Sequence, residues 1–144
     1  IAVDSLIENV CQLMKEELKS KNISLQKTIH PPQLEIGCDP DQITMILINL
    51  IKNAIESLQN QADRQIHIRA IGQGDLGSLI QIEDNGPGIV PEALERIFVP
   101  FYTTKKTGSG IGLAISRQIM NLHRGSLTVE SEPDQRTVFS LNFR

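Results

Sequence analysis

Two asparagines on a predicted helix are the first residues whose type and spacing indicate chemistry. Asn49 and Asn53 lie four residues apart, so a helix places both side chains on one side, at the border of its apolar face. Asparagine is a poor residue for a helix interior, and two of them at this spacing call for a reason. The carbonyl oxygen of a side-chain amide is a hard ligand that suits Mg²⁺. The alternative is that both amides simply face the solvent.

Asp84 is the second candidate, because strand alternation places its carboxylate on the same side as the apolar Ile80 and Ile82. A carboxylate that points toward the core requires hydrogen-bond donors, since an unpaired buried charge is costly. The exocyclic amine of adenine is such a donor, whereas guanine presents a carbonyl oxygen at the same position. The alternative is that Asp84 is only a cap or turn residue.

Two glycine-rich segments follow Asp84 in the chain. Asn85-Gly86-Pro87-Gly88 has the composition of a hairpin turn, but no partner strand follows it, so its glycines suit backbone that a flat ligand approaches closely. Gly108-Ser109-Gly110-Ile111-Gly112 begins a predicted helix. Free N–H groups at a helix start form an anion site suited to phosphates, although a plain flexible loop is the alternative.

The second glycine-rich segment differs from the common dinucleotide and P-loop motifs. Its spacing is G-x-G-x-G rather than G-x-G-x-x-G, and no buried strand precedes it. Glu130 and Glu132 follow at about the distance of a ribose-binding acid, but the spacing and the missing strand argue against that fingerprint. The chain also has no G-x-x-x-x-G-K-[ST] loop.

The spacing of apolar residues predicts the elements that must position these groups. Apolar residues at helical spacing predict helices over residues 3–20, 40–58 and 111–123, with a short helical stretch at 91–96. Asp39-Pro40-Asp41-Gln42 is typical of a helix start. Alternating residues predict strands over 24–30, 65–71, 78–84, 126–131 and 137–143, with a hairpin turn at 72–75. This order predicts an α/β sandwich, with helices packed on one face of a mixed, mostly antiparallel sheet.

Length and composition predict one domain that spans residues 1–144. The chain has 144 residues, of which 40% are hydrophobic and 22% charged, as is ordinary for a globular protein with a real core. The net charge of −3 argues mildly against a dedicated nucleic-acid binder. Cys11 and Cys38 fit neither a metal-ligand spacing nor a disulfide framework, so we expect reduced thiols.

The first residues of the chain and the length of its apolar runs indicate its cellular location and its relation to a longer protein. No run approaches the ~20 apolar residues that span a bilayer, and no signal segment opens the chain, so we expect a soluble, cytoplasmic domain. The chain begins at Ile1, already inside an amphipathic pattern. We therefore expect a fragment of a longer protein, whose remaining parts could include a membrane anchor.

Taken in order, four segments resemble the N, G1, F and G2 boxes of the histidine kinases. Asn49-Leu50-Ile51-Lys52-Asn53-Ala54 resembles the N box, and Asp84-Asn85-Gly86-Pro87-Gly88-Ile89 resembles the G1 box. Ile97-Phe98-Val99-Pro100-Phe101-Tyr102-Thr103-Thr104-Lys105 resembles the F box, and Gly108-Ser109-Gly110-Ile111-Gly112-Leu113 the G2 box. The resemblance covers essentially the whole chain and is most similar to the nitrogen-regulator type of sensor kinase.

This resemblance implies the Bergerat fold, which binds ATP and Mg²⁺ under a mobile lid, here at about residues 90–110. It implies that Asn53 ligates Mg²⁺, that Asn49 contacts the phosphates or ribose, and that Asp84 accepts a hydrogen bond from adenine. Phe98 and Phe101 would be the hydrophobic pins of the lid. The full set of residues that the resemblance places at the ATP site is Asn49, Asn53, Asp84, Gly86, Gly88, Ile89, Thr103, Lys105, Gly108, Ser109, Gly110, Ile111, Gly112, Leu113 and Thr137.

The activity implied is transfer of the γ-phosphoryl group of ATP to a histidine on a separate dimerisation domain, in a two-component system with a response regulator. DNA gyrase B and MutL share the fold but activate water with a glutamate at the position of Asn49, so transfer is favoured over hydrolysis. His30, His67 and His123 lie outside the family's acceptor pattern. The alternatives are an anti-sigma-type serine kinase and a nucleotide-sensing module without transfer activity.

Two positions depart from the family pattern. Glu56 occupies a position where many members have a lysine or arginine, so the charge that neutralises phosphate must come from elsewhere, with Lys105 and Lys106 as candidates. Gln135-Arg136 replaces the glycine pair that often precedes the closing threonine. Both departures bear on individual contacts and leave the predicted pocket in place.

Overall fold

Five strands form one sheet in the described part of the chain, residues 1–102 and 111–144 of a computed structural model. The strands lie in the order β1-β2-β3-β5-β4. Their bounds are Ser24–His30 for β1, Gln65–Gly72 for β2, Ser78–Asp84 for β3, Ser126–Glu132 for β4 and Arg136–Phe143 for β5. β1 pairs with β2 in parallel, whereas the other neighbours are antiparallel. The predicted mixed, mostly antiparallel sheet is confirmed.

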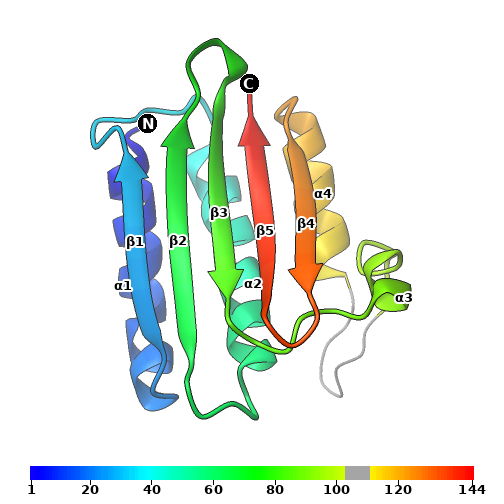
Figure 1. The fold of residues 1–144 in the computed structure, drawn as a ribbon. Helices are drawn as coiled ribbons and strands as arrows, with labels where there is room; N and C mark the ends of the chain where they lie inside the picture. Colours follow the sequence, from blue (N-terminus) through cyan, green and yellow to red (C-terminus); the bar gives the residue numbers. More distant parts are fainter. Residues whose placement is uncertain (103–110) are drawn as a thin grey trace.

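Three long helices cover one face of this sheet (Figure 1). Helix α1 spans Val3–Ser20, α2 spans Pro40–Ser57 and α4 spans Gly112–Leu122. The short α3, Pro91–Leu94, lies beyond the β4 edge of the sheet, near α4 (Figure 1). Each predicted helix and strand is present, and the bounds agree to within two residues.

The hydrophobic core lies between the helices and the inner face of the sheet. Helices and strands both contribute side chains at their apolar positions, as the two periodicities predict. Burying one such side chain contributes roughly 1.5–3 kcal/mol to folding. The largest fully buried side chains are Ile7, Ile43, Ile46, Leu47, Leu50, Ile51, Leu58, Ile66, Ile68, Ile80, Ile82 and Met120.

The N-terminus of α2 is fixed by the predicted acidic cap. Asp39 Oδ1 accepts hydrogen bonds from the backbone N–H groups of Asp41 at 3.0 Å and Gln42 at 3.2 Å. The Asp39 N–H in turn donates to His123 Nε2 at 3.1 Å, and His123 Nδ1 lies 2.9 Å from the Ile119 carbonyl. Because a backbone N–H can only donate, the ring proton must be on Nδ1. His123 therefore ties the end of α4 to the start of α2.

The outer face of the sheet is polar and carries a row of ion pairs. Glu83 Oε1 lies 3.0 Å from Arg69 Nη1 and 3.2 Å from Arg136 Nη1, and Arg136 Nη2 lies 3.0 Å from Glu132 Oε1. Burial raises the pKa of Glu83, but the hydrogen bond and charge of Arg69, together with Arg136, outweigh it and hold that pKa below its ordinary value. This face is stabilised by charge pairing instead of apolar packing.

Two further expectations concern thiols and membranes. Cys11 and Cys38 are free and partly buried, and burial raises the pKa of both thiols. In residues 1–102 and 111–144, no helix combines the length and apolar character needed to cross a bilayer.

Candidate functional site

Asp84 and Thr137 face each other at one end of the sheet. They are partners in the antiparallel register of β3 and β5. Asp84 is 4% exposed and Thr137 is 3% exposed. Asp84 continues the buried alternation of Ile80 and Ile82, so its predicted inward orientation is confirmed. A buried carboxylate and a buried hydroxyl therefore end two adjacent strands on the helix side.

Helix α2 supplies a donor to this carboxylate. Asp84 Oδ1 accepts a hydrogen bond from Gly86 N at 2.9 Å, and it also accepts one from Ser57 Oγ at 3.3 Å. Ser57 is the last residue of α2, so the end of that helix meets the end of β3. The sequence analysis did not assign Ser57 to the site, although it follows Asn53 by one helical turn and thus lies on the same side of α2.

Gly86 and Gly88 occupy positions without space for a side chain. A Cβ on Gly86 would lie 2.3 Å from Ser57 Oγ and 2.8 Å from Asp84 Oδ1. Gly88 has a φ of +78°, which favours glycine, and its Cβ would lie 2.7 Å from the Glu132 carbonyl oxygen. The two glycines therefore allow other atoms of the protein to approach the backbone closely at these positions.

The segment after Gly88 is attached to the end of β4, next to the β4–β5 turn that it crosses in Figure 1. Ile89 N donates to Ser131 Oγ at 2.7 Å, and Ser131 Oγ lies 3.3 Å from Thr137 Oγ1. Ser131 is a second residue that the sequence analysis did not identify. Strand alternation gives the signal, because it places Ser131 on the inner face together with Leu127 and Val129.

Asn49 connects α2 to the start of α4. Its Nδ2 donates to Ser116 Oγ at 3.4 Å, and Ser116 is buried. A Cβ on Gly112 would lie 2.5 Å from Asn49 Oδ1. Asn49 is half-buried, and these contacts show that its amide packs between the two helices instead of simply facing the solvent. Asn53 is also half-buried and lies one turn further along α2, toward Ser57.

The remaining predicted site residues lie partly inside and partly outside the range that the structure describes. Ile111 and Leu113 flank Gly112 and are half-buried. Five predicted residues lie outside the described part of the chain: Thr103, Lys105, Gly108, Ser109 and Gly110.

The two phenylalanines predicted to be pins have different surroundings. Phe98 is partly buried against the core, and the Arg117 guanidinium of α4 lies 4.5 Å from its ring centroid, within cation–π range. Phe101 is 77% exposed, so its predicted role as a second hydrophobic pin is wrong for this structure. Phe101 has a left-handed φ of +70° in a turn, and this turn leaves its ring in solvent instead of against the core.

The two departures from the family pattern have different surroundings. Glu56 is exposed on α2. Arg136 directs its guanidinium to Glu83 and Glu132 on the outer face, whereas the next residue, Thr137, faces inward. The arginine that replaces a glycine therefore leaves the inner face of β5 unchanged.

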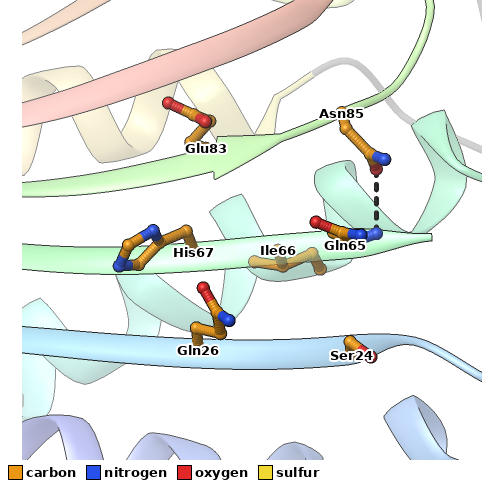
Figure 2. Close-up of a pocket in the computed structure, with 7 residues that line it drawn as sticks. All are labelled: Ser24, Gln26, Gln65, Ile66, His67, Glu83 and Asn85. Atoms are coloured by element: carbon orange, nitrogen blue, oxygen red, sulfur yellow. Dashed lines mark hydrogen bonds between the residues drawn. The ribbon is translucent and has the colours of Figure 1, made fainter. Parts of the chain in front are cut away.

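A polar hollow of about 180 Å³ lies on the outer face of the sheet (Figure 2). Burial lowers the pKa of His67 at this hollow, and the charge of Arg69 lowers it further. Asn85 Oδ1 accepts from Gln65 N there at 2.8 Å (Figure 2). We place the candidate site on the opposite, helix-covered face, because the buried Asp84 carboxylate and the contact between Asn49 and Gly112 both lie on that face. The hollow is lined by Ser24, Gln26, Gln65, Ile66, His67, Glu83 and Asn85.

The donor set on the inner side fits a nucleotide with a hard cation. Helix α2 carries the amide side chains of Asn49 and Asn53, and Mg²⁺ takes oxygen ligands while keeping waters and phosphate oxygens around it. The start of α4, with a glycine and no side-chain cap, presents backbone N–H groups that suit an anion. Among the described residues no group of three or more His, Cys, Asp or Glu could hold a metal alone.

Comparison with known sequences identifies a matching family. The family described as histidine kinase-, DNA gyrase B-, and HSP90-like ATPase matches residues 38–144. The sensor histidine kinase ZraS of Salmonella typhimurium is 33% identical over 141 residues, which are 98% of this chain and 30% of ZraS. The chain thus spans less than a third of the length of this curated relative.

Solved structures share the fold over nearly the whole chain. The catalytic domain of histidine kinase ThkA, free of nucleotide, has a TM-score of 0.85 at 29% identity and covers 99% of this chain and 95% of that domain. ThkA in complex with the response regulator protein TrrA has a TM-score of 0.81 at 27% identity, over 100% of this chain and 41% of that chain. Full-length ShkA in complex with AMPPNP has a TM-score of 0.86 at 26% identity, over 98% of this chain and 29% of that chain.

Proposed function

Because this chain belongs to the family of histidine kinase-, DNA gyrase B-, and HSP90-like ATPases, we propose that it binds ATP with Mg²⁺ and donates the γ-phosphoryl group to a histidine on a separate dimerisation domain. One observation carries this proposal. The buried carboxylate of Asp84, the amide of Asn49 and the start of α4 at Gly112 lie on the same helix-covered side of the sheet. These groups suit a base and a phosphate chain, and Asn53, one turn further along α2, is the residue proposed to hold the cation.

Asp84 recognises the base in this proposal. Its carboxylate is 4% exposed and ends β3, where Thr137 faces it from β5. A buried carboxylate is stabilised by hydrogen-bond donors, and the exocyclic amine of adenine adds one. A guanine or hypoxanthine base presents a carbonyl oxygen at that position, which repels the carboxylate. We therefore expect selectivity for adenine nucleotides.

Asn53 and the start of α4 hold the charged end of the nucleotide. The Asn53 amide oxygen is the proposed protein ligand of Mg²⁺, and Asn49 contacts the phosphates or ribose. The backbone N–H groups that begin α4 donate to phosphate oxygens, and the helix dipole adds a favourable partial charge. The bound cation neutralises charge on the phosphates. The chain thus contributes positioning and electrostatic stabilisation, which are the main requirements of phosphoryl transfer.

Transfer to a protein acceptor is favoured over hydrolysis because of the residue type at position 49. Asn49 is an amide that packs against Ser116 and Gly112. An amide cannot accept the proton of an attacking water, whereas the glutamate of the related hydrolases can. We therefore propose that the γ-phosphoryl group leaves to a nucleophile that a second domain brings to the site.

The proposed partners come from the same family assignment. ThkA was solved in complex with a response regulator protein, and ShkA was solved in complex with AMPPNP. We propose that the longer protein containing this chain likewise passes its phosphoryl group to a response regulator in the cytoplasm. We propose no nucleic-acid partner. The alternative function is that of an anti-sigma-type serine kinase.

Mixing this chain with the histidine-bearing helical domain of the same protein, in the presence of ATP labelled on the γ-phosphoryl group, tests the proposal. The expected label on that domain is lost in acid and retained in base, as a phosphohistidine requires. The matched control is the same domain with its acceptor histidine replaced by glutamine, which should remain unlabelled. Acid-stable label on serine would favour the serine kinase, and ATP binding without any transfer would favour a sensing module.

A further inference from the structure

Ser57 makes an unusual hydrogen bond for a serine at the end of a helix. Its hydroxyl donates to Asp84 Oδ1 at 3.3 Å, across 27 positions of sequence and onto another element. Ser20, at the end of α1, behaves in the ordinary way, because its hydroxyl donates to the Glu17 carbonyl of its own helix at 3.0 Å. The two serines occupy equivalent helix ends, so the contact with Asp84 is particular to Ser57.

The same carboxylate oxygen is held from a second side. Gly86 N donates to Asp84 Oδ1 at 2.9 Å, and the surrounding space is so tight that a Cβ on Gly86 would lie 2.3 Å from Ser57 Oγ. The hydroxyl, the carboxylate oxygen and the Gly86 backbone are thus in mutual contact. Two donors on Oδ1 restrict rotation of the carboxyl group, because turning it would break both hydrogen bonds.

We propose that Ser57 is a positioning residue that fixes the orientation of the Asp84 carboxylate and thereby determines selectivity for an adenine base. This inference rests on the proposed function, which makes Asp84 the acceptor for the exocyclic amine. Ser57 acts through Asp84, so it stabilises only complexes in which the base donates to that carboxylate. A ligand without the amine gains nothing from the fixed orientation.

Titration calorimetry of this chain with ATP and with inosine triphosphate, both in the presence of Mg²⁺, separates these effects. Inosine carries a carbonyl oxygen where adenosine carries the amine, and the two nucleotides are otherwise alike. The Ser57→Ala variant should bind ATP roughly three- to tenfold more weakly and should bind inosine triphosphate as the unmodified chain does. The Ser57→Thr variant keeps the hydroxyl and should restore the preference for ATP.

A double-mutant cycle supplies the second readout. In an Asp84→Ala background, Ser57→Ala should cause no further loss of ATP affinity, because its effect passes through the carboxylate. Ser20→Ala is the matched control and should change neither affinity. Thermal unfolding and circular dichroism of each variant establish that the compared proteins are folded.

Other results of these experiments would contradict either the inference about Ser57 or the proposed recognition of adenine by Asp84. If Ser57→Ala weakens both nucleotides equally, or retains its effect without Asp84, Ser57 has a general structural role or touches the ligand directly and the inference is wrong. In that case the role of Asp84 still stands. If the unmodified chain itself binds ATP and inosine triphosphate equally, the base recognition in the proposed function is wrong, and the inference fails with it.

Discussion

Gly112 lies directly against Asn49, so closely that a Cβ on the glycine would lie 2.5 Å from Asn49 Oδ1 and 3.0 Å from Asn49 Cγ and Nδ2. The contact joins the first residue of α4 to the middle of α2. It also places the backbone N–H groups at the start of α4 beside an amide of the proposed N box. The geometry of the proposed phosphate-binding region therefore depends on the absence of a side chain at position 112.

The Gly112→Ala substitution should weaken ATP binding by about five- to a hundredfold. The new methyl group overlaps the Asn49 amide, and such overpacking displaces side chain or backbone at a cost of roughly 1–3 kcal/mol. Calorimetry measures the change in affinity. Gly37→Ala is the matched control, because a Cβ there meets nothing within 4 Å, and it should bind ATP normally. Normal ATP affinity in the Gly112→Ala variant would mean that this contact does not shape the site.

The Asp84→Asn substitution should weaken ATP binding by about ten- to a hundredfold, because it removes a charge-assisted hydrogen bond in a buried setting worth roughly 1.5–3 kcal/mol. Glu83→Gln makes the same chemical change one residue earlier, on the outer face, and should leave ATP affinity unchanged. Binding titrations of both variants with ATP and GTP provide the comparison. Equal affinity of the unmodified chain for ATP and GTP would contradict adenine recognition by Asp84.

Asn53→Ala should abolish phosphoryl transfer while leaving the chain folded. The substitution removes the proposed amide ligand of Mg²⁺, so ATP affinity should also stop depending on the concentration of that ion. The measurement is labelled transfer together with ATP titrations at several Mg²⁺ concentrations. Asn60, which is exposed just beyond α2, provides the control substitution Asn60→Ala. Ordinary transfer by the Asn53→Ala variant would reject the metal assignment.

Stability should depend on pH through Glu83. Its pKa in the folded chain lies below the ordinary value. The ion pairs of Glu83 therefore stabilise the folded state fully at pH values above about 4.3, the ordinary pKa of a glutamate. This stabilisation disappears as the pH falls through the folded pKa. Urea unfolding of Glu83→Gln should show a loss of up to about 1 kcal/mol near neutral pH, and this loss should become smaller as the pH is lowered through the acid range. A loss that stays constant over the whole pH range would show that the charge of Glu83 is not the cause.

Much of the fold follows from local patterns in the sequence. Apolar spacing predicted α1 and α2, alternation predicted the strands, and the acidic cap at Asp39 formed as expected. Alternation also placed the Asp84 side chain inward. These predictions succeeded because each depends on neighbours within a few positions, where helical and strand periods fix the direction of a side chain.

The parts that were not predicted depend on contacts between distant segments. Ser57 joins the end of α2 to Asp84, and Ser131 joins the end of β4 to Ile89. A sequence alone does not show which hydroxyl contacts which distant segment. The prediction that Phe101 is a hydrophobic pin was wrong for a related reason. The apolar character of the side chain predicts burial, whereas the backbone turn that carries it determines the direction of the ring. The pairing of Arg136 with Glu83 likewise requires the register of β3 against β5.

A decisive experiment is a map of backbone amide chemical shifts as ATP and Mg²⁺ are added to the isotope-labelled chain. If ATP binds between α2, α4 and the end of β3, the largest changes should occur on the helix-covered side, at Asn53, Gly86, Gly88 and Gly112, and Gln26 and His67 on the outer face should change little. Changes concentrated on the outer-face hollow, with Gly86 and Gly112 unaffected, would show that ATP does not bind on the helix-covered side.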